Sequence, residues 1–149
     1  MPPAKTKTSV TGIPFNRHLG LVEAEDPSAL LELPEGLQYL NHLGTVHAGA
    51  LLSLADAASG EFLLRQFGSQ SGVIPVVRRL ESKFRKPANG RIVAKASADR
   101  DALARVETDL ASKGRVLLPV MVELYDGSGT HVLSAKVEWY LQKHDPSRD

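Results

Sequence analysis

The sequence predicts an α+β domain in which an antiparallel sheet of about six strands curves around one long central helix. Four segments in the later part of the chain alternate apolar and polar residues with a period of two, as strands with one buried face do. Two shorter segments near the start flank a turn. Residues 47–67 are apolar nearly all round, which is typical of a buried helix. Such a set of strands and one helix indicates a sheet packed on that helix.

The composition is that of one globular domain. The chain has 149 residues, of which 42% are hydrophobic and 23% charged, enough to bury a core. The net charge of +1 gives no general reason to expect nucleic acid or a membrane surface as a partner. The absence of cysteine excludes a disulfide framework, a thiolate nucleophile and a Cys-ligated zinc.

The chain is expected to be cytoplasmic and to fold as one unit. No segment approaches the ~18 apolar residues of a membrane helix, and the first residues lack the apolar core of a signal peptide. Residues 1–12 are rich in Pro, Lys and Thr and are expected to form a flexible arm. Residues 144–149 are expected to form a flexible tail, which leaves residues 13–143 as the domain.

The first elements are a short hairpin and the central helix. Residues 19–25 and 29–33 flank the turn-forming pair Asp26 and Pro27, which predicts two short paired strands. Residues 47–67 form the predicted central helix. Between positions 47 and 60 the only formally charged side chain is Asp56.

Residues 74–86 form the first long predicted strand. Its apolar face, which we expect to point into the core, holds Ile74, Val76, Arg78, Leu80, Ser82 and Phe84. Residues 91–97 form the next strand, and the turn-forming residues 87–90 are expected to join the two as a hairpin.

Two further strands follow, at residues 116–124 and 130–142. The turn sequence at residues 126–129 predicts an antiparallel hairpin between them. Leu133, Val137 and Trp139 lie on the inward face of the last strand, and both Trp139 and Phe84 are expected to fill core. Residues 101–114 carry an apolar stripe and end on Lys113 and Gly114, which predicts a short surface helix.

Asp56 is the candidate catalytic group. On the central helix, Gly49, Ser53, Asp56 and Gly60 fall along one line, so a ligand or another backbone can approach the carboxylate. A buried carboxylate acquires partners, takes a raised pKa or opens onto a cleft, and acids so placed are candidates for general bases. The alternative is a structural ion pair with Arg78, which shares the apolar face of its strand.

The residues around the start of this helix resemble a family motif. Asn41 lies six positions before His47, the small residues Ala48 and Gly49 follow, and Asp56 lies nine positions after the histidine. This spacing resembles the motif of hotdog-fold acyl-CoA thioesterases, in particular the phenylacetyl-CoA thioesterase-like group, with HAG in place of HGG. Residues 84–96, FRKPANGRIVAKA, also look like a strand of that family, and the resemblance spans residues 15–142.

The resemblance implies a hotdog fold, sheets paired edge to edge in a homodimer or a dimer of dimers, and sites at the interface. It implies that the Ala48 N–H holds the carbonyl oxygen of an acyl-CoA substrate, a role suited to a helix N-terminus. Asn41 orients water or the carbonyl. Asp56 of the partner subunit activates water as general base or attacks directly, and no cofactor is required. The Ala48 methyl can crowd the carbonyl, and residues 75–77 lack the hydroxyl that some relatives carry.

Other residues are candidates for binding the substrate. His47 is expected to pack and form hydrogen bonds at the helix start, with Gly49 and Ser53 beside it. The basic residues Lys83, Arg85 and Lys86 could contact the phosphates of coenzyme A, although a run of charge is more often a solvated strand face.

Metal and nucleic-acid sites are not expected from the sequence. His42 and His47 lack a third ligand for a metal, and nucleic-acid binding needs a broader basic field. Two functions remain open: an acyl-CoA thioesterase, and a hotdog module that binds an acyl thioester or assembles without turnover. A hydratase ranks third, because it typically needs a histidine close to the acid and none follows Asp56 suitably.

Overall fold

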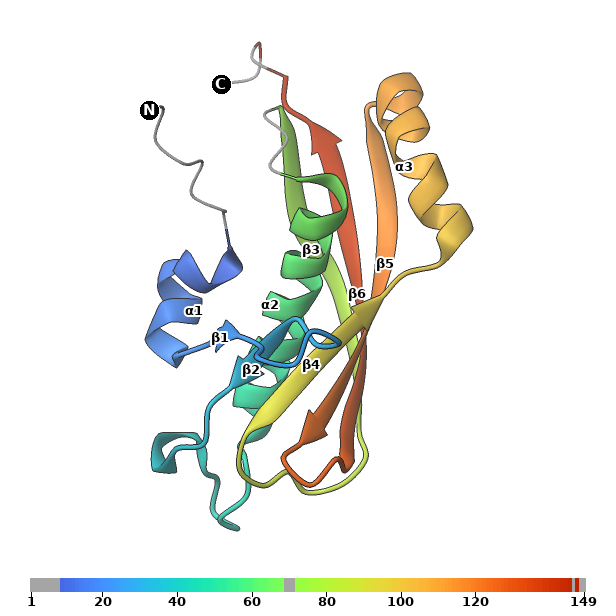
Figure 1. The fold of residues 1–149 in the computed structure, drawn as a ribbon. Coiled ribbons are helices and arrows are strands. Elements are labelled where there is room, and N and C mark those ends of the chain that lie inside the picture. Colours follow the sequence, from blue (N-terminus) through green and yellow to red (C-terminus); the bar gives the residue numbers. More distant parts are fainter. Residues whose placement is uncertain (1–8, 69–71, 146, 148–149) are drawn as a thin grey trace.

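The computed structural model describes residues 9–68, 72–145 and 147. Six antiparallel strands form one sheet in the order β1-β2-β4-β5-β6-β3, and this sheet curves around the long helix α2, Ala48–Phe67 (Figure 1). The strands are β1 Val22–Glu23, β2 Leu31–Leu33, β3 Val73–Phe84, β4 Ile92–Ser97, β5 Arg115–Asp126 and β6 His131–Lys143. The remaining helices are η1 Val10–Gly12, α1 Pro14–Leu19, η2 Leu37–Tyr39 and α3 Arg100–Lys113.

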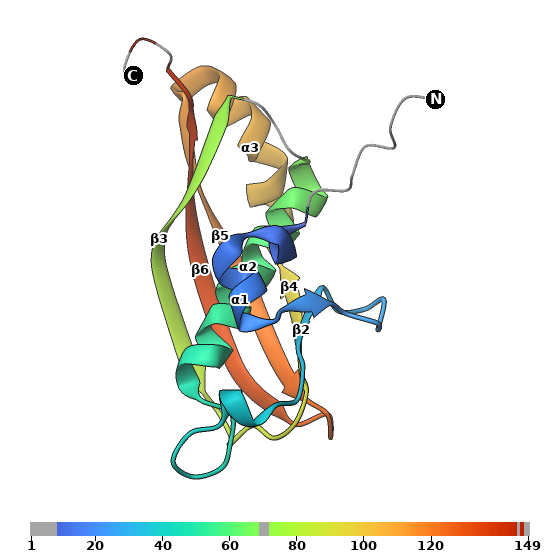
Figure 2. The same ribbon diagram turned by 90° about the vertical axis from the view of Figure 1, so that its left-hand side faces the viewer.

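Helix α2 lies along one face of the sheet, as Figure 2 shows from the side. It contacts β2, β4, β5 and β6. Leu54, Ala55 and Ala58 have no exposed surface, and the two alanines let the helix axis approach the strands closely. The prediction of a buried helix over residues 47–67 is confirmed, with His47 as its N-cap residue.

The inner faces of β5 and β6 form the other half of the core. Leu118, Val120 and Val122 are fully buried, as are Leu133 and Val137 on the neighbouring strand. The hairpin between β5 and β6 turns at residues 126–129. These predictions from alternation are confirmed, because an uninterrupted strand keeps the period of two that the sequence shows.

Strand β3 departs from its predicted pattern. Val77 lies opposite Trp139 and Arg79 opposite Glu138, so Arg78 is an extra residue in a β-bulge. The bulge exchanges the two faces of the strand. The prediction that Ile74 and Val76 face the core is therefore wrong, and they are 48% and 49% exposed.

The predicted hairpin between residues 74–86 and 91–97 is also wrong. Among the described strands, β3 pairs only with β6, whereas β4 pairs with β2 and β5, so the segment between them crosses the end of the sheet (Figure 1). Within this crossover Ala88 is buried and its carbonyl accepts a hydrogen bond from the Val46 N–H. Phe84, expected in the core, is 48% exposed at the start of the crossover.

The early part of the chain contains more helix than predicted. Strands β1 and β2 pair as expected but are shorter, and residue 19 ends α1. The predicted flexible arm of residues 1–12 is wrong at its inner end, because Val10 is buried in η1 and its N–H donates to Glu61. Residues 1–8, 146, 148 and 149 of the predicted arm and tail lie outside the described residues.

The predicted surface helix at residues 101–114 is confirmed as α3. Asp99 caps its N-terminus and Gly114 ends it, while Val106 and Leu110 are buried. No helix in the described part of the chain combines the length and the apolar character needed to cross a bilayer.

Candidate active site

The loop before α2 is shaped by Asn41. The Asn41 Oδ1 accepts hydrogen bonds from the N–H groups of Leu43 and Thr45, at 2.9 and 3.1 Å. The Asn41 Nδ2 donates to the Thr45 Oγ1 at 3.0 Å, which leaves its second amide hydrogen available. Asn41 therefore holds the loop and keeps one donor for a ligand.

His47 caps the helix and leaves one N–H free beside it. The His47 Nδ1 accepts a hydrogen bond from the Gly49 N–H at 2.8 Å, and the His47 N–H donates to the Tyr39 carbonyl. A Cβ at Gly49 would lie 3.2 Å from that Nδ1, so the glycine gives the cap its room. The Ala48 N–H has no hydrogen-bond partner among the described residues, and it lies at the positive end of α2.

A groove of about 300 Å³ lies beside this helix start. Asn41 and Ala48 line it together with Arg85 and Lys86 from the crossover, so the structure brings four predicted site residues into one place. The exposed Phe84 ring, expected in the core, lines the same groove. Lys83 is exposed on β3 and does not line it.

Asp56 lies further along α2 on a stripe of small residues. Ser53, Asp56 and Gly60 are each partly exposed, and the Ser53 Oγ donates to the Gly49 carbonyl at 2.8 Å. The Asp56 carboxylate forms no hydrogen bond or ion pair with any described residue. Burial raises the pKa of Asp56 above its ordinary value of 3.8.

The proposed ion pair between Asp56 and Arg78 is wrong. Arg78 is exposed at the β-bulge, whereas it was expected on the inner face. The structural alternative that the sequence left open is therefore absent among the described residues, and the interpretation of Asp56 as a general base stays a prediction.

Asp56 differs in this respect from the buried acids in the described part of the chain. Glu61, also on α2, accepts from the Val10 N–H and pairs with Arg65 at 3.3 Å. Glu32 pairs with Arg91, and Asp126 accepts backbone N–H groups in the hairpin turn. Each of those acids has the partners that burial requires, which marks Asp56 as the acid not used to hold the fold.

Ala48 and Asp56 cannot act together within one chain. They are eight residues apart on the same helix, which is about 12 Å along the axis. During attack, the N–H must lie within about 3 Å of the carbonyl oxygen, and the carboxylate must lie within about 3 Å of the attacking water.

A polar network that was not expected holds Arg85. The Arg85 Nε donates to the Ser134 Oγ at 2.8 Å, and that hydroxyl donates to Glu123, to which the His131 Nε2 is also bonded. Ser134 lies directly opposite Glu123 in the β5-β6 hairpin. The network could have been predicted from the register of that hairpin, since the turn at residues 126–129 fixes which residues face each other.

The two histidines considered for a metal do not form a site in the structure. His42 is exposed, and the His47 Nδ1 is used in the helix cap. Across the described ranges, no three His, Asp or Glu side chains gather in a way that could hold a metal ion.

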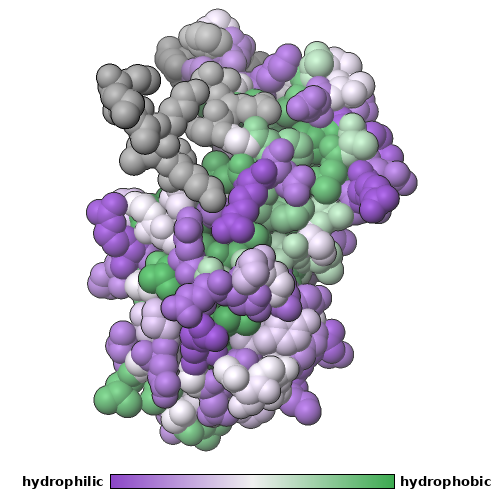
Figure 3. All heavy atoms as spheres, viewed as in Figure 1, coloured by the Kyte–Doolittle hydropathy of each residue, from purple (hydrophilic) through white to green (hydrophobic). Residues whose placement is uncertain are grey.

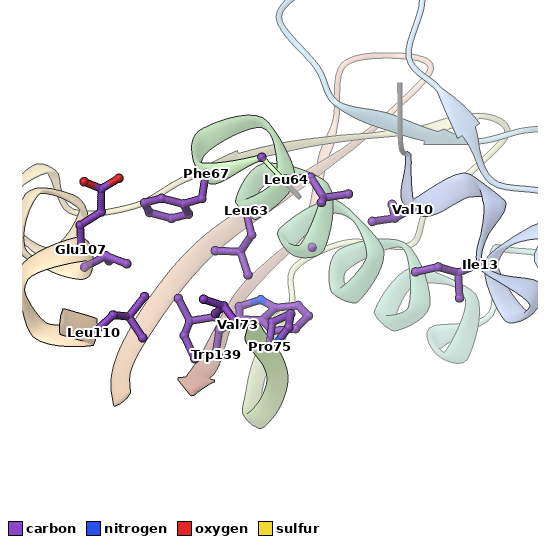
Figure 4. Close-up of a pocket in the computed structure, with 14 residues that line it drawn as sticks. Val10, Ile13, Leu63, Leu64, Phe67, Val73, Pro75, Glu107, Leu110 and Trp139 are labelled. Atoms are coloured by element: carbon purple, nitrogen blue, oxygen red, sulfur yellow. The ribbon is translucent and has the colours of Figure 1, made fainter. Parts of the chain in front are cut away.

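A second cavity, which the sequence analysis did not predict, lies at the other end of α2. Apolar side chains from η1, α2, β3, α3 and β6 line it, among them Leu64, Phe67 and Trp139 (Figure 4). Its volume is about 300 Å³. Figure 3 shows apolar surface at this end of the molecule, beside α3.

Comparison with known proteins gives a family and a set of related structures. The model of a family described as a domain of unknown function, DUF4442, matches residues 19–141. No curated protein matches the chain. The chain is similar to a protein of Pseudomonas aeruginosa described as a probable thioesterase, with 28% identity over 91% of each chain and a TM-score of 0.75.

Two further solved structures are similar over most of the chain. A Bacillus halodurans protein solved with CoA has 25% identity and a TM-score of 0.59, over 74% of this chain and 69% of that protein. A Haemophilus influenzae thioesterase has 13% identity and a TM-score of 0.67, over 90% of this chain and 86% of that protein. Together with the sheet and helix described above, these likenesses confirm the hotdog fold.

Proposed function

This chain belongs to the DUF4442 family, and we propose that it hydrolyses an acyl-CoA-type thioester at a site shared by two copies of the chain. The observation that carries the proposal is the partly buried Asp56 carboxylate, which has no partner among the described residues. Similarity to the P. aeruginosa protein, described as a probable thioesterase, supports a thioester as the substrate. The assignment to a phenylacetyl-CoA-like branch remains part of the proposal.

The N-terminus of α2 holds the thioester carbonyl. The Ala48 N–H has no partner among the described residues and lies in the first turn, where the helix dipole favours the negative oxygen that develops during attack. The remaining amide hydrogen of Asn41 lies on the same groove and orients the carbonyl or the attacking water. Both groups act without a metal or a cofactor.

Asp56 activates water. The carboxylate takes a proton from water as the water oxygen bonds to the carbonyl carbon, and the carbon–sulfur bond then breaks. The proton passes to the departing thiolate, which has a pKa of about 8.5 if it behaves as a cysteine thiol, so no strong acid is required. Direct attack by the carboxylate is the alternative, with an anhydride formed and then hydrolysed.

The second copy supplies Asp56 to the site that contains Ala48. In the described chain β3 is an edge strand, paired only with β6, and it carries exposed Ile74 and Val76. An exposed apolar edge is a template for pairing with another strand. Pairing of β3 with β3 of a second copy joins the two sheets and covers these side chains.

Coenzyme A, the thiol carrier that we propose, binds along the groove beside Ala48. Arg85 and Lys86 line the groove and offer cations to the phosphates, while the Phe84 ring offers an apolar face. Lys83 lies nearby on β3, outside the groove, and adds positive charge to this edge. The B. halodurans protein, solved with CoA, supports this class of carrier.

A thiol-release assay over a panel of acyl-CoA esters tests the proposal. We expect turnover by the unmodified chain, and a loss of kcat/KM of about 10²- to 10⁴-fold in Asp56→Asn. Asp101→Asn, which changes an exposed acid on α3, is the control and should keep full activity. Unchanged hydrolysis in Asp56→Asn would remove Asp56 from the mechanism. Binding of acyl-CoA without any turnover would show a binding module instead.

A further inference from the structure

The cavity at the C-terminal end of α2 has the character of a site for a hydrocarbon group. Its lining side chains are apolar except for the exposed Glu107, which lies at the edge beside Phe67 in Figure 4. Its volume of about 300 Å³ is at the lower end of ligand pockets. An apolar group enters such a space without leaving a polar group unpaired.

The cavity begins one helical turn beyond Asp56. Gly60 lines it and lies four residues further along the same side of α2, which is about 6 Å along the axis. A Cβ at Gly60 would meet Val10 and Trp139 at 3.5 and 3.6 Å. Gly60 thus adds no side chain of its own between Asp56, which lies outside the cavity lining, and the cavity.

Hydrogen bonds join the wall of the cavity to the turn that carries Asp56. The Trp139 Nε1–H donates to the Ser59 Oγ at 3.0 Å, and that hydroxyl donates to the Asp56 carbonyl at 2.7 Å. The indole lines the cavity while its polar edge is satisfied by α2. Cavity and carboxylate are thus held in a fixed relation.

We propose that this cavity binds the hydrocarbon chain of the thioester whose carbonyl lies at Asp56, and that it selects linear acyl groups of medium length. The inference rests on the proposed thioesterase function. An apolar cavity of about 150 Å³ holds a benzene ring, so one of about 300 Å³ takes about eight to twelve carbons. The groove of one copy receives the thiol carrier, and the cavity of the other receives the acyl chain.

Helix α3 and η1 set the length limit. Val106 and Leu110 of α3 close one end of the cavity, and both are buried against the sheet. Val10 of η1 closes the side nearest Gly60. The helix between β4 and β5 is therefore the proposed specificity element, because its side chains line the end of the cavity that a longer chain would reach.

Leu64 allows a direct test, because it lines the cavity and is only partly buried. The probes are S-butyl-CoA and S-decyl-CoA, thioethers that bind without being hydrolysed, with calorimetry as the readout. We expect the unmodified chain to bind S-decyl-CoA at least tenfold more tightly, since each buried methylene contributes up to about fourfold. Leu64→Trp fills the cavity and should remove this preference, whereas Leu64→Ala should keep it and extend it to S-tetradecyl-CoA.

Leu37→Trp is the matched control, because Leu37 is 87% exposed and lies outside the cavity and the groove. This variant should keep the preference for S-decyl-CoA. Equal affinity for the two thioethers in the unmodified chain would overturn the proposal, as would an equal weakening of both by Leu64→Trp.

Assays of turnover distinguish a failure of this inference from a failure of the proposed thioesterase function on which it rests. Tight, Leu64-dependent binding of S-decyl-CoA with no hydrolysis of decanoyl-CoA would support the cavity as an acyl-chain site and overturn the proposed hydrolysis. Hydrolysis of butanoyl-CoA and decanoyl-CoA at equal kcat/KM, with equal binding of the two thioethers, would support the proposed hydrolysis and overturn the cavity as an acyl-chain site.

Discussion

Asp56 and Glu61 lie on the same helix, and their surroundings explain why Glu61 is structural and Asp56 is available for chemistry. Glu61 is almost fully buried but accepts from a backbone N–H and pairs with Arg65. Asp56 is less buried and has no such partner within the described chain. Its charge therefore costs stability when the chain folds, and the raised pKa of Asp56 is the sign of that cost.

The pH dependence of stability tests this account of Asp56. Because burial raises the pKa in the folded state, the contribution of Asp56 to stability is full below the unfolded pKa and is lost as pH rises through the folded pKa. Asp56→Asn carries no charge, so it should unfold at a higher temperature than the unmodified chain at pH 7, with a gap that closes toward pH 3.

Calorimetric melting of both proteins between pH 3 and pH 8 measures this gap. The kcat/KM should rise with pH as Asp56 ionises, and the midpoint of this rise should lie above the pKa of an ordinary aspartate. A gap that stays constant with pH, or that favours the unmodified chain at pH 7, would contradict an unpaired buried carboxylate.

At the scale of elements, the pairing of β5 with β6 and of β6 with β3 assembles one side of the groove. The hydroxyl of Ser134 on β6 joins Arg85 at the end of β3 to Glu123 on β5. Strand β3 and the β5-β6 hairpin, which are distant in sequence, thus hold one guanidinium beside the groove. Since the Nε is bonded to Ser134, the two terminal nitrogens remain to contact phosphate.

Removal of the Ser134 hydroxyl should weaken binding of coenzyme A esters specifically. We expect Ser134→Ala to raise KM for an acyl-CoA by about two- to tenfold, the effect of about 0.5–1.5 kcal/mol for one typical hydrogen bond. KM for the matching acyl-pantetheine, which lacks the phosphates, should not change.

Ser134→Thr keeps the hydroxyl and should restore the KM for acyl-CoA. Ser112→Ala on α3 is the control, because the Ser112 hydroxyl donates to the Thr108 carbonyl of its own helix and to no other described residue. An equal rise of KM for acyl-CoA and acyl-pantetheine would place Ser134 in folding rather than in recognition of phosphate.

At the scale of the whole molecule, one chain holds the proposed site residues apart. The groove with Ala48 and the carboxylate of Asp56 are two turns apart on α2. An edge-to-edge contact through β3 with a second copy is the arrangement that we propose brings them together. The acyl chain and its carrier then lie on different copies.

Mixing two inactive variants tests the shared site. Ala48→Pro removes the N–H and should keep the helix, because proline is accepted at the first position of a helix and His47 already has the extended backbone that proline requires. Ala48→Pro and Asp56→Asn should each be nearly inactive. Random mixed dimers should recover about a quarter of full activity, since half of them are hybrids with one intact site of two.

Co-expression of the two variants with different affinity tags yields the hybrid dimer for assay. Hybrids that form but show no activity would place Ala48 and Asp56 in one chain's site. A chain that stays monomeric at assay concentration would exclude the shared site altogether.

The sequence alone determined the features that depend on local periodicity. The apolar run of residues 47–67 specified the central helix, and alternation with turn residues specified β5 and β6. The lack of charge around Asp56 already marked it as unusual. These features are predictable because side-chain spacing along a helix or a strand is fixed by its own backbone geometry.

Tertiary structure alone decided which residues meet. The bulge at Arg78 turned Ile74 and Val76 outward, and the crossover after Phe84 brought Arg85 and Lys86 to the groove. The absence of an Arg78 partner for Asp56, and the cavity closed by α3, follow from the same arrangement. Pairing, register and burial depend on contacts between distant segments, and a one-residue insertion in a strand changes all of them without altering the local pattern.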